Sequence, residues 1–151
     1  MPVATLDEIR AMVGREVGLS DWIEVGQDRI EAFADATDDH QFIHVDPKAA
    51  ALTGFGGTIA HGFLSLSLLS RMAADAMLVP DSTRMAVNYG LDRVRFLAPV
   101  AAGKRVRGRF TLESVDQKAP GQLLLKHQVT VEIEREEKPA LTAVWLGLIF
   151  T

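Results

Sequence analysis

A carboxylate and an imidazole, Asp39 and His44, lie five positions apart in a polar segment of this 151-residue chain. Pro47 disfavours the helical conformation at the residue before it, and the side chains of residues 42–45 suit an extended chain, so we expect this segment to be extended. Shortly afterwards Gly62 opens a long apolar stretch, and the first N–H groups of a helix there would have no acceptor within the helix. A carboxylate, an imidazole and such free donors are the groups needed to add water across a double bond conjugated to a carbonyl. The pattern therefore predicts an enzyme.

A metal site is the alternative for the same segment, because His40 and His44 are four positions apart with three aspartates close by. Histidines at this spacing converge on one ion when they lie on a helix. In the extended segment expected here they would be separated by roughly 13 Å, at about 3.3 Å per residue. No third ligand with its supporting partners stands out. The sequence therefore predicts neither a metal ion nor another cofactor.

The composition excludes several classes of protein. The formal net charge is −4 and no basic cluster or aromatic platform stands out, which argues against nucleic-acid binding. The chain has no cysteine and therefore no disulfide framework or thiolate site. The longest apolar run falls far short of the ~20 residues of a membrane span, and residues 1–14 lack the apolar core of a secretory signal. These features favour a cytoplasmic protein that does not enter a membrane.

The first half of the chain is expected to be mainly helical. Thr5–Glu8 has the form of a capping box, and an amphipathic pattern predicts a helix over 27–37 after a short strand at 22–25. The longest helix is predicted from about Ile59 to Met77, closed by Pro80. Its apolar residues point in nearly all directions, so this helix should be buried on most faces.

The second half of the chain alternates with the period of β-strands. A hairpin turning near Ala119 would place Arg105 opposite Glu134 and Arg107 opposite Glu132. Facing opposite charges would support this register by roughly 0.2–1 kcal/mol each. The arginines of this half could instead bind the phosphates of an acyl carrier, but a solvated face paired to glutamates is the simpler interpretation.

Helices followed by an antiparallel sheet indicate an α+β fold. The last run, Leu141–Phe150, is apolar on both faces and should be a covered, central strand. The economical arrangement is a hot-dog fold, a single domain over residues 1–151 in which a bent antiparallel sheet wraps around the long apolar helix. Such a sheet keeps an exposed edge, so we expect at least a homodimer.

Two segments resemble a known family. The run Ala36–Pro47, ATDDHQFIHVDP, followed by Ala60–Gly62, resembles the hydratase motif of the MaoC-like (R)-specific enoyl-CoA hydratases. The likeness is closer to the nodulation protein N branch of that superfamily, where Asn88–Phe96 is also familiar. The resemblance extends from about Leu6 to Phe150.

The resemblance implies roles for individual residues. The catalytic aspartate falls on Asp39, the histidine on His44, and the glycine whose N–H polarises the thioester carbonyl on Gly62. Ser70, a packing residue by its sequence context, falls on a supporting serine. The chain departs from the commoner motif by having glutamine and phenylalanine where asparagine and proline are usual. The residues expected beside the substrate are Gln41, Gly57, His61 and Ser70.

The resulting hypothesis is reversible syn hydration of a trans-2-enoyl-CoA to the (R)-3-hydroxyacyl thioester. Asp39 would be the principal base and His44 its acid or positioning partner, although a coupled pair cannot be divided from sequence. Two alternatives remain. The first is thioester cleavage by a carboxylate and a helix-end donor, which the same scaffold also supports. The second is a non-catalytic subunit that binds an acyl chain or small ligand.

Overall fold

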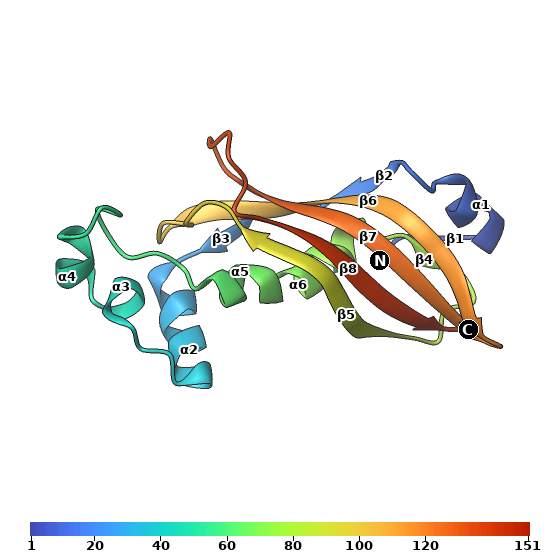
Figure 1. Ribbon diagram of the computed structural model, residues 1–151, viewed down its shortest axis with the longest axis horizontal. Coiled ribbons are helices and arrows are strands. Elements are labelled where there is room, and N and C mark those ends of the chain that lie inside the picture. The colour runs from blue at the N-terminus through green and yellow to red at the C-terminus, as the bar shows by residue number, and fades with distance from the viewer.

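The computed structural model describes residues 1–151 and is built on a six-stranded sheet in which every pairing is antiparallel (Figure 1). The strand order is β2-β6-β7-β8-β5, and β3 pairs with β6 beside β2. The strands are β2 (Glu16–Leu19), β3 (Ile23–Val25), β5 (Met85–Phe96), β6 (Lys104–Ala119), β7 (Gln122–Ile133) and β8 (Leu141–Phe150). A parallel pair, β1 (Val3–Ala4) and β4 (Val79–Pro80), joins the N-terminus to the end of the last helix.

Six helices accompany the sheet, and none of them has the length and hydropathy of a membrane-spanning segment. The last two helices along the chain lie on the inner side of the curved sheet, whereas the second, third and fourth extend beyond its end (Figure 1). They are α1 (Leu6–Ala11), α2 (Gln27–Thr37), α3 (Phe42–Val45), α4 (Pro47–Ala51), α5 (Gly62–Ser67) and α6 (Leu69–Ala76). The capping box predicted at Thr5 is present, with its side chain accepting from the Glu8 N–H.

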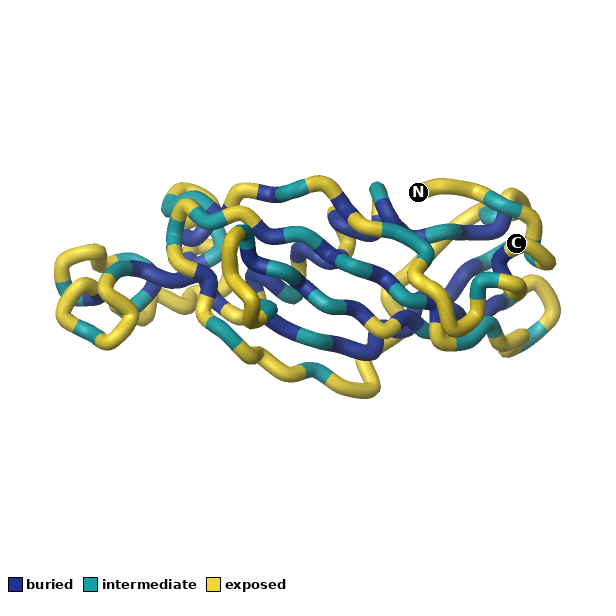
Figure 2. Tube along the Cα trace, turned by 90° about the horizontal axis from the view of Figure 1, so that it is seen from above, coloured by how far each residue is buried: buried dark blue, intermediate teal, exposed yellow.

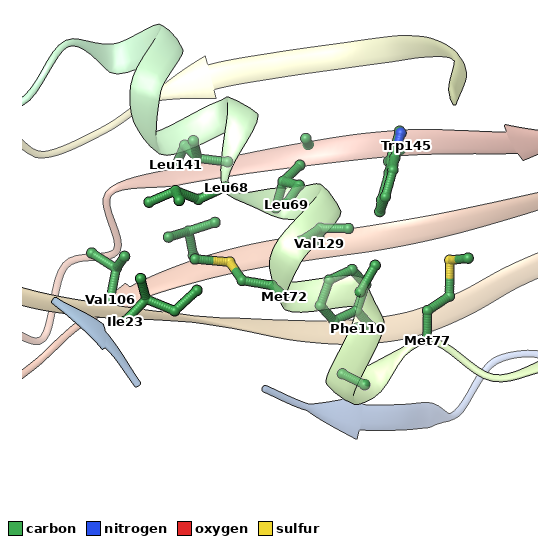
Figure 3. Close-up of a cluster of buried hydrophobic side chains, with 14 of the residues drawn as sticks. Ile23, Leu68, Leu69, Met72, Met77, Val106, Phe110, Val129, Leu141 and Trp145 are labelled. Carbon is green, nitrogen blue, oxygen red and sulfur yellow. The ribbon is translucent and has the colours of Figure 1, made fainter. Parts of the chain in front are cut away.

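The core lies between α6 and the sheet (Figure 3). Met72 of α6 is completely buried together with Phe110 of β6 and Val129 of β7. At the end of α6 the backbone approaches β2 so closely that a Cβ on Gly18 would lie 2.2 Å from the Ala76 carbonyl oxygen. The predicted α+β, hot-dog architecture, a bent antiparallel sheet around an apolar helix, is confirmed.

The predicted hairpin is also confirmed. β6 and β7 meet at a turn over Pro120–Gly121, and Arg107 faces Glu132 with its Nε 2.7 Å from Oε2. Arg105 donates from Nε to Glu134 Oε2 at 2.8 Å. These arginines are paired to glutamates on the outer face of the sheet, as the simpler interpretation of the sequence had it.

The long helix begins later than predicted and is divided. Ile59 forms a β-bridge with Ala101, and the Ala60 N–H donates to the Val100 carbonyl, so these two residues are extended. The helix starts at Gly62 and is interrupted at Leu68, which separates α5 from α6. Nor is it covered on every side, because Phe63 is 67% exposed.

The segment around His44 is helical, which contradicts the predicted extended conformation. Residues Phe42–Val45 form a single turn, α3, in which the Asp46 N–H donates to the Phe42 carbonyl. The effect expected of Pro47 is confined to Asp46, which is extended and caps the next helix, α4. The β-preference of these side chains is weak, and local hydrogen bonding and tertiary contacts override it.

The neighbouring strands β8 and β5 differ in environment. β8 is buried along its length between β7 and β5, as predicted. β5 pairs only with β8 and forms an edge that is exposed along nearly its whole length (Figure 2). His127 of β7 is buried in the interior with neither ring nitrogen hydrogen-bonded, and burial lowers its pKa to about 4.

Candidate active site

Asp39 lies just outside the last turn of α2. Asp38 takes the left-handed conformation there, with φ of 58°, and ends the helix. The Asp39 N–H still donates to the Ala34 carbonyl at 3.1 Å, while its Oδ1 accepts from the Gln41 N–H at 3.4 Å. Its side chain is 55% exposed, so the carboxylate remains accessible.

His44 is held in one orientation by a main-chain partner. The residue is only 7% exposed, and its Nδ1 lies 2.7 Å from the Ile59 carbonyl oxygen. Because a carbonyl oxygen only accepts, Nδ1 must carry the hydrogen, and in the neutral ring Nε2 then has the free lone pair. The ring nitrogen that can take up a proton is therefore Nε2.

Gln27, which the sequence analysis did not single out, fastens the main chain of His44. Its Nε2 donates to the His44 carbonyl at 2.8 Å, and its Oε1 accepts from Thr58 Oγ1 at 2.6 Å. One amide at the start of α2 thus joins α3 to the strand-like segment before α5. The long separation in sequence explains why no local pattern indicated it.

His61 completes the group from the position before α5. It is 3% exposed, and its Nε2 lies 2.9 Å from the Asp39 carbonyl oxygen. The His61 ring stacks on His44 with centroids 3.8 Å apart and 27° between the planes, and Phe33 of α2 lies 5.0 Å away. Its Nδ1 is buried without a partner.

A carboxylate oxygen of Asp39 and one ring nitrogen each of His44 and His61 lie within 4.8 Å of one another. Three potential metal ligands therefore meet, and they differ from the histidine pair considered from the sequence. The two rings stack with 27° between their planes, and because imidazole lone pairs lie in the ring plane, they run nearly parallel and do not converge on one ion about 2 Å away. His61 Nε2 is also already hydrogen-bonded to the main chain. This donor set suits proton transfer better than metal binding.

His40 does not take part in this cluster. Its Nε2 lies 2.8 Å from Asp35 Oδ1, and this hydrogen bond raises the pKa of His40. The two histidines that the sequence suggested as a metal pair thus have separate environments.

A cavity of about 270 Å³ opens beside His44 and Gly62. The Leu64 and Ser65 N–H groups both donate to the His61 carbonyl, whereas the N–H groups of the first two residues of α5 have no acceptor within the helix. Phe96, at the end of β5, covers Gly62 so closely that a Cβ there would lie 3.0 Å from its ring. The lining is otherwise mostly apolar: Ile59, Ala60, Ser65, Leu97, Ala98, Pro99, Val100 and Ala140.

Two residues of this lining were missed from sequence. Ser65 is buried and is a polar residue in a largely apolar lining, and Phe96 comes from a strand that lies far along the chain. Ser65 could have been found from the sequence, because serines are the polar residues that interrupt the apolar residues of this helix. No local signal identified Phe96.

None of the four residues expected beside the substrate lines this cavity, His61 included. Gln41 precedes α3 and is exposed, and Gly57 is half-buried in the loop after α4. Ser70 lies in α6, where Asn88 Nδ2 is 3.5 Å from its Oγ, and it lines a second cavity of about 180 Å³. Asp39 does not line the first cavity either, but its carboxylate stands beside the His44 ring.

Known proteins are similar to this chain in sequence. The model of the MaoC like domain matches residues 8–135. Nodulation protein N of Rhizobium leguminosarum bv. viciae is 53% identical over 96% of this chain and 91% of its own length. The 3-hydroxyacyl-thioester dehydratase Z of Mycobacterium tuberculosis is 46% identical over 90% of this chain and 89% of its own.

Solved structures agree on the fold. A MaoC-like dehydratase from Rhodospirillum rubrum superposes with a TM-score of 0.78 at 20% identity, covering 97% of both chains. An (R)-hydratase from A. caviae gives a TM-score of 0.72 at 22% identity, covering 89% of this chain and 94% of its own. With a family model spanning most of the chain and relatives matched nearly end to end, the chain belongs to the MaoC-like dehydratase family.

Proposed function

We propose that this protein is an (R)-specific enoyl-CoA hydratase that acts reversibly on trans-2-enoyl thioesters and needs no cofactor. One observation carries the proposal: the Asp39 carboxylate and the His44 ring meet beside an apolar cavity that contains the N-terminus of α5. The relative named as a 3-hydroxyacyl-thioester dehydratase supports the same substrate class. At about 270 Å³ the cavity is below the range of about 300–1,000 Å³ for whole-ligand pockets, which suits the reacting end of a longer thioester.

In this proposal Asp39 and His44 hold one water molecule over C3 of the substrate. Asp39 is the principal base, and His44 accepts from the same water at Nε2. As the new C3–O bond forms, the pair takes a proton from the water, and the electrons of the double bond move toward the thioester carbonyl. The pair then releases that proton to C2 on the same face, so net addition of water leaves it unchanged.

The Gly62 N–H is the proposed donor to the thioester oxygen, where negative charge develops as C3 is attacked. Loss of such a donor typically costs about 3–4 kcal/mol of barrier. Gly57, Gln41 and Ser70 are proposed to support substrate further from the reacting carbons.

The test is turnover of crotonyl-CoA and a longer trans-2-enoyl-CoA, followed by loss of the conjugated thioester absorbance, with chiral analysis of the product. Asp39→Asn and His44→Gln should each lower kcat by about 10²–10⁴-fold and change KM little, because the pair acts on the transition state. Asp35→Asn is the matched control, since that exposed carboxylate pairs with His40 and lies outside the cluster.

Formation of the (R)-3-hydroxyacyl thioester, lost in both site variants and kept in the control, is the expected result. Release of free CoA without hydration would instead assign the protein to thioester cleavage. If the folded protein consumes neither substrate, the hydratase proposal is wrong.

We further propose a homodimer formed through β5. Val87, Tyr89 and Leu91 are exposed on this unpaired edge, an arrangement that invites pairing with a second strand. Sedimentation velocity at micromolar concentration should give twice the mass of the chain, and Leu91→Lys should shift the protein toward monomer. A wild-type protein that sediments as a monomer at every concentration would contradict this.

A further inference from the structure

His61 makes a contact with each of the two proposed catalytic residues. Its Nε2 lies 2.9 Å from the Asp39 carbonyl oxygen, and its ring stacks on that of His44 at 3.8 Å. We infer that His61 is a positioning residue that fixes the orientation of Asp39 and His44 relative to each other, an inference that rests on the proposed hydratase function.

The hydrogen bond fixes the main chain that carries the carboxylate. The acceptor is a carbonyl oxygen, so the hydrogen must be on His61 Nε2. Asp39 follows a left-handed residue in the short linker between α2 and α3, where its N–H donates to the Ala34 carbonyl and its Oδ1 accepts a long bond of 3.4 Å from the Gln41 N–H. Without this donor, the direction of the Asp39 carboxylate relative to the cavity would depend on its weaker contacts alone.

The stack fixes the plane of the catalytic imidazole. The His61 ring lies between His44 of α3 and Phe33 of α2, with centroid separations of 3.8 and 5.0 Å. His44 Nδ1 is anchored to the Ile59 carbonyl, and the flat surface of His61 prevents rotation about that anchor. The two restraints together set where Nε2 of His44 points.

The remaining nitrogen of His61 indicates why this position holds a histidine. Its Nδ1 is buried with no partner, an arrangement that costs stability. A residue present only for packing would fill the site without that cost. An imidazole is retained because it supplies a flat ring and, at the same time, an N–H aimed at Asp39.

Two substitutions separate these contributions. His61→Phe keeps a flat ring against His44 and loses the donor, whereas His61→Gln keeps an N–H donor and loses the ring. His127→Leu is the matched control, because it removes another buried histidine that is outside the site. Circular dichroism and thermal melting establish that each variant is folded.

With crotonyl-CoA, both His61 variants should lower kcat by about 10- to 100-fold while KM stays within about threefold, since small displacements of catalytic groups cost this much. The control should stay within about twofold of wild type in both constants. Of the two His61 variants, His61→Gln is expected to keep the greater part of the activity, because it restores the bond to Asp39.

Nitrogen-15 NMR of the imidazoles gives a readout that does not need turnover. Wild-type His44 should show a single tautomer with the hydrogen on Nδ1, and its signals should broaden or shift in the His61 variants but not in His127→Leu. An unchanged His44 spectrum in both His61 variants, or unchanged kcat in both, overturns the inference. Absence of turnover in the wild type with an intact His44 tautomer would instead refute only the hydratase proposal, and if His61→Phe fails to fold, His61→Gln carries the test.

Discussion

His127 should make this protein lose stability at mildly acidic pH. Its ring extends from β7 into the interior, packs edge-on against Phe110 with centroids 6.3 Å apart, and has no partner at either nitrogen. Burial lowers its pKa from 6.5 to about 4. The unfolded chain therefore binds the proton more strongly than the folded chain, so this group destabilises the fold as pH drops from about 6.5 toward 4 and contributes nothing further below that.

The magnitude follows from the two pKa values. Each unit of difference is worth about 1.4 kcal/mol, and between pH 7 and pH 5 the folded state should lose about 2 kcal/mol through His127 alone. His127→Leu removes this contribution and also removes two unpartnered nitrogens, so the variant should be at least as stable as wild type at pH 7.

Urea unfolding followed by tryptophan fluorescence at pH 7, 6 and 5, at one fixed protein concentration, measures the effect. With a slope of about 2 kcal/mol per molar urea, the gap between the midpoints of variant and wild type should widen by about 1 M over this range. Comparison with the variant cancels the carboxylates that also titrate. Parallel midpoints across the three pH values would refute the argument that a buried, neutral His127 governs this pH range.

Three further predictions concern positioning and close packing. Gln27→Leu removes the hydrogen bonds from Gln27 to the His44 carbonyl and to Thr58, so it should lower the free energy of unfolding by about 2–4 kcal/mol. The variant should also have a lower kcat and a KM that changes less. An unaltered kcat in a folded variant would show that this anchor is not needed. Gly62→Ala should impair turnover because its Cβ would press on the Phe96 ring at 3.0 Å, and Phe96→Leu should restore part of the activity in the double variant; additive losses would argue against the clash. Gly18→Ala should lower the free energy of unfolding by about 1–3 kcal/mol or more, because its Cβ would lie 2.2 Å from a backbone oxygen. Gly147→Ala, with open space at its Cβ, should change the free energy of unfolding by less than about 1 kcal/mol. Chemical denaturation compares the two variants, and equal effects would contradict the close approach of β2 to α6.

Much of the second half of the molecule was predictable because its information is local or pairwise. The register of Arg107 with Glu132 followed from counting outward from one turn, and the run 141–150 was apolar on both faces because it is a central strand. A strand period of two makes such inferences strong, since a shift by one residue would expose every buried side chain.

The segment that carries the proposed site was harder to predict. The residues around His44 favour extended structure by type, yet they form a helical turn because hydrogen bonds from Gln27 and to Ile59 hold that turn in place. The start of the long helix was misplaced for a related reason, as Ile59 pairs with Ala101 from a distant loop. In both cases the deciding partner is far along the chain.

The amino-acid sequence by itself determined the α+β class, the hairpin register, and the candidate pair Asp39 and His44, because each depends on periodicity or on residues near one another in the chain. Only the tertiary structure decided that His61 stacks on His44, that Phe96 covers Gly62, and which nitrogen of His44 is free. These depend on where separate elements meet, and packing between elements is set by the whole fold and leaves no pattern at any one position.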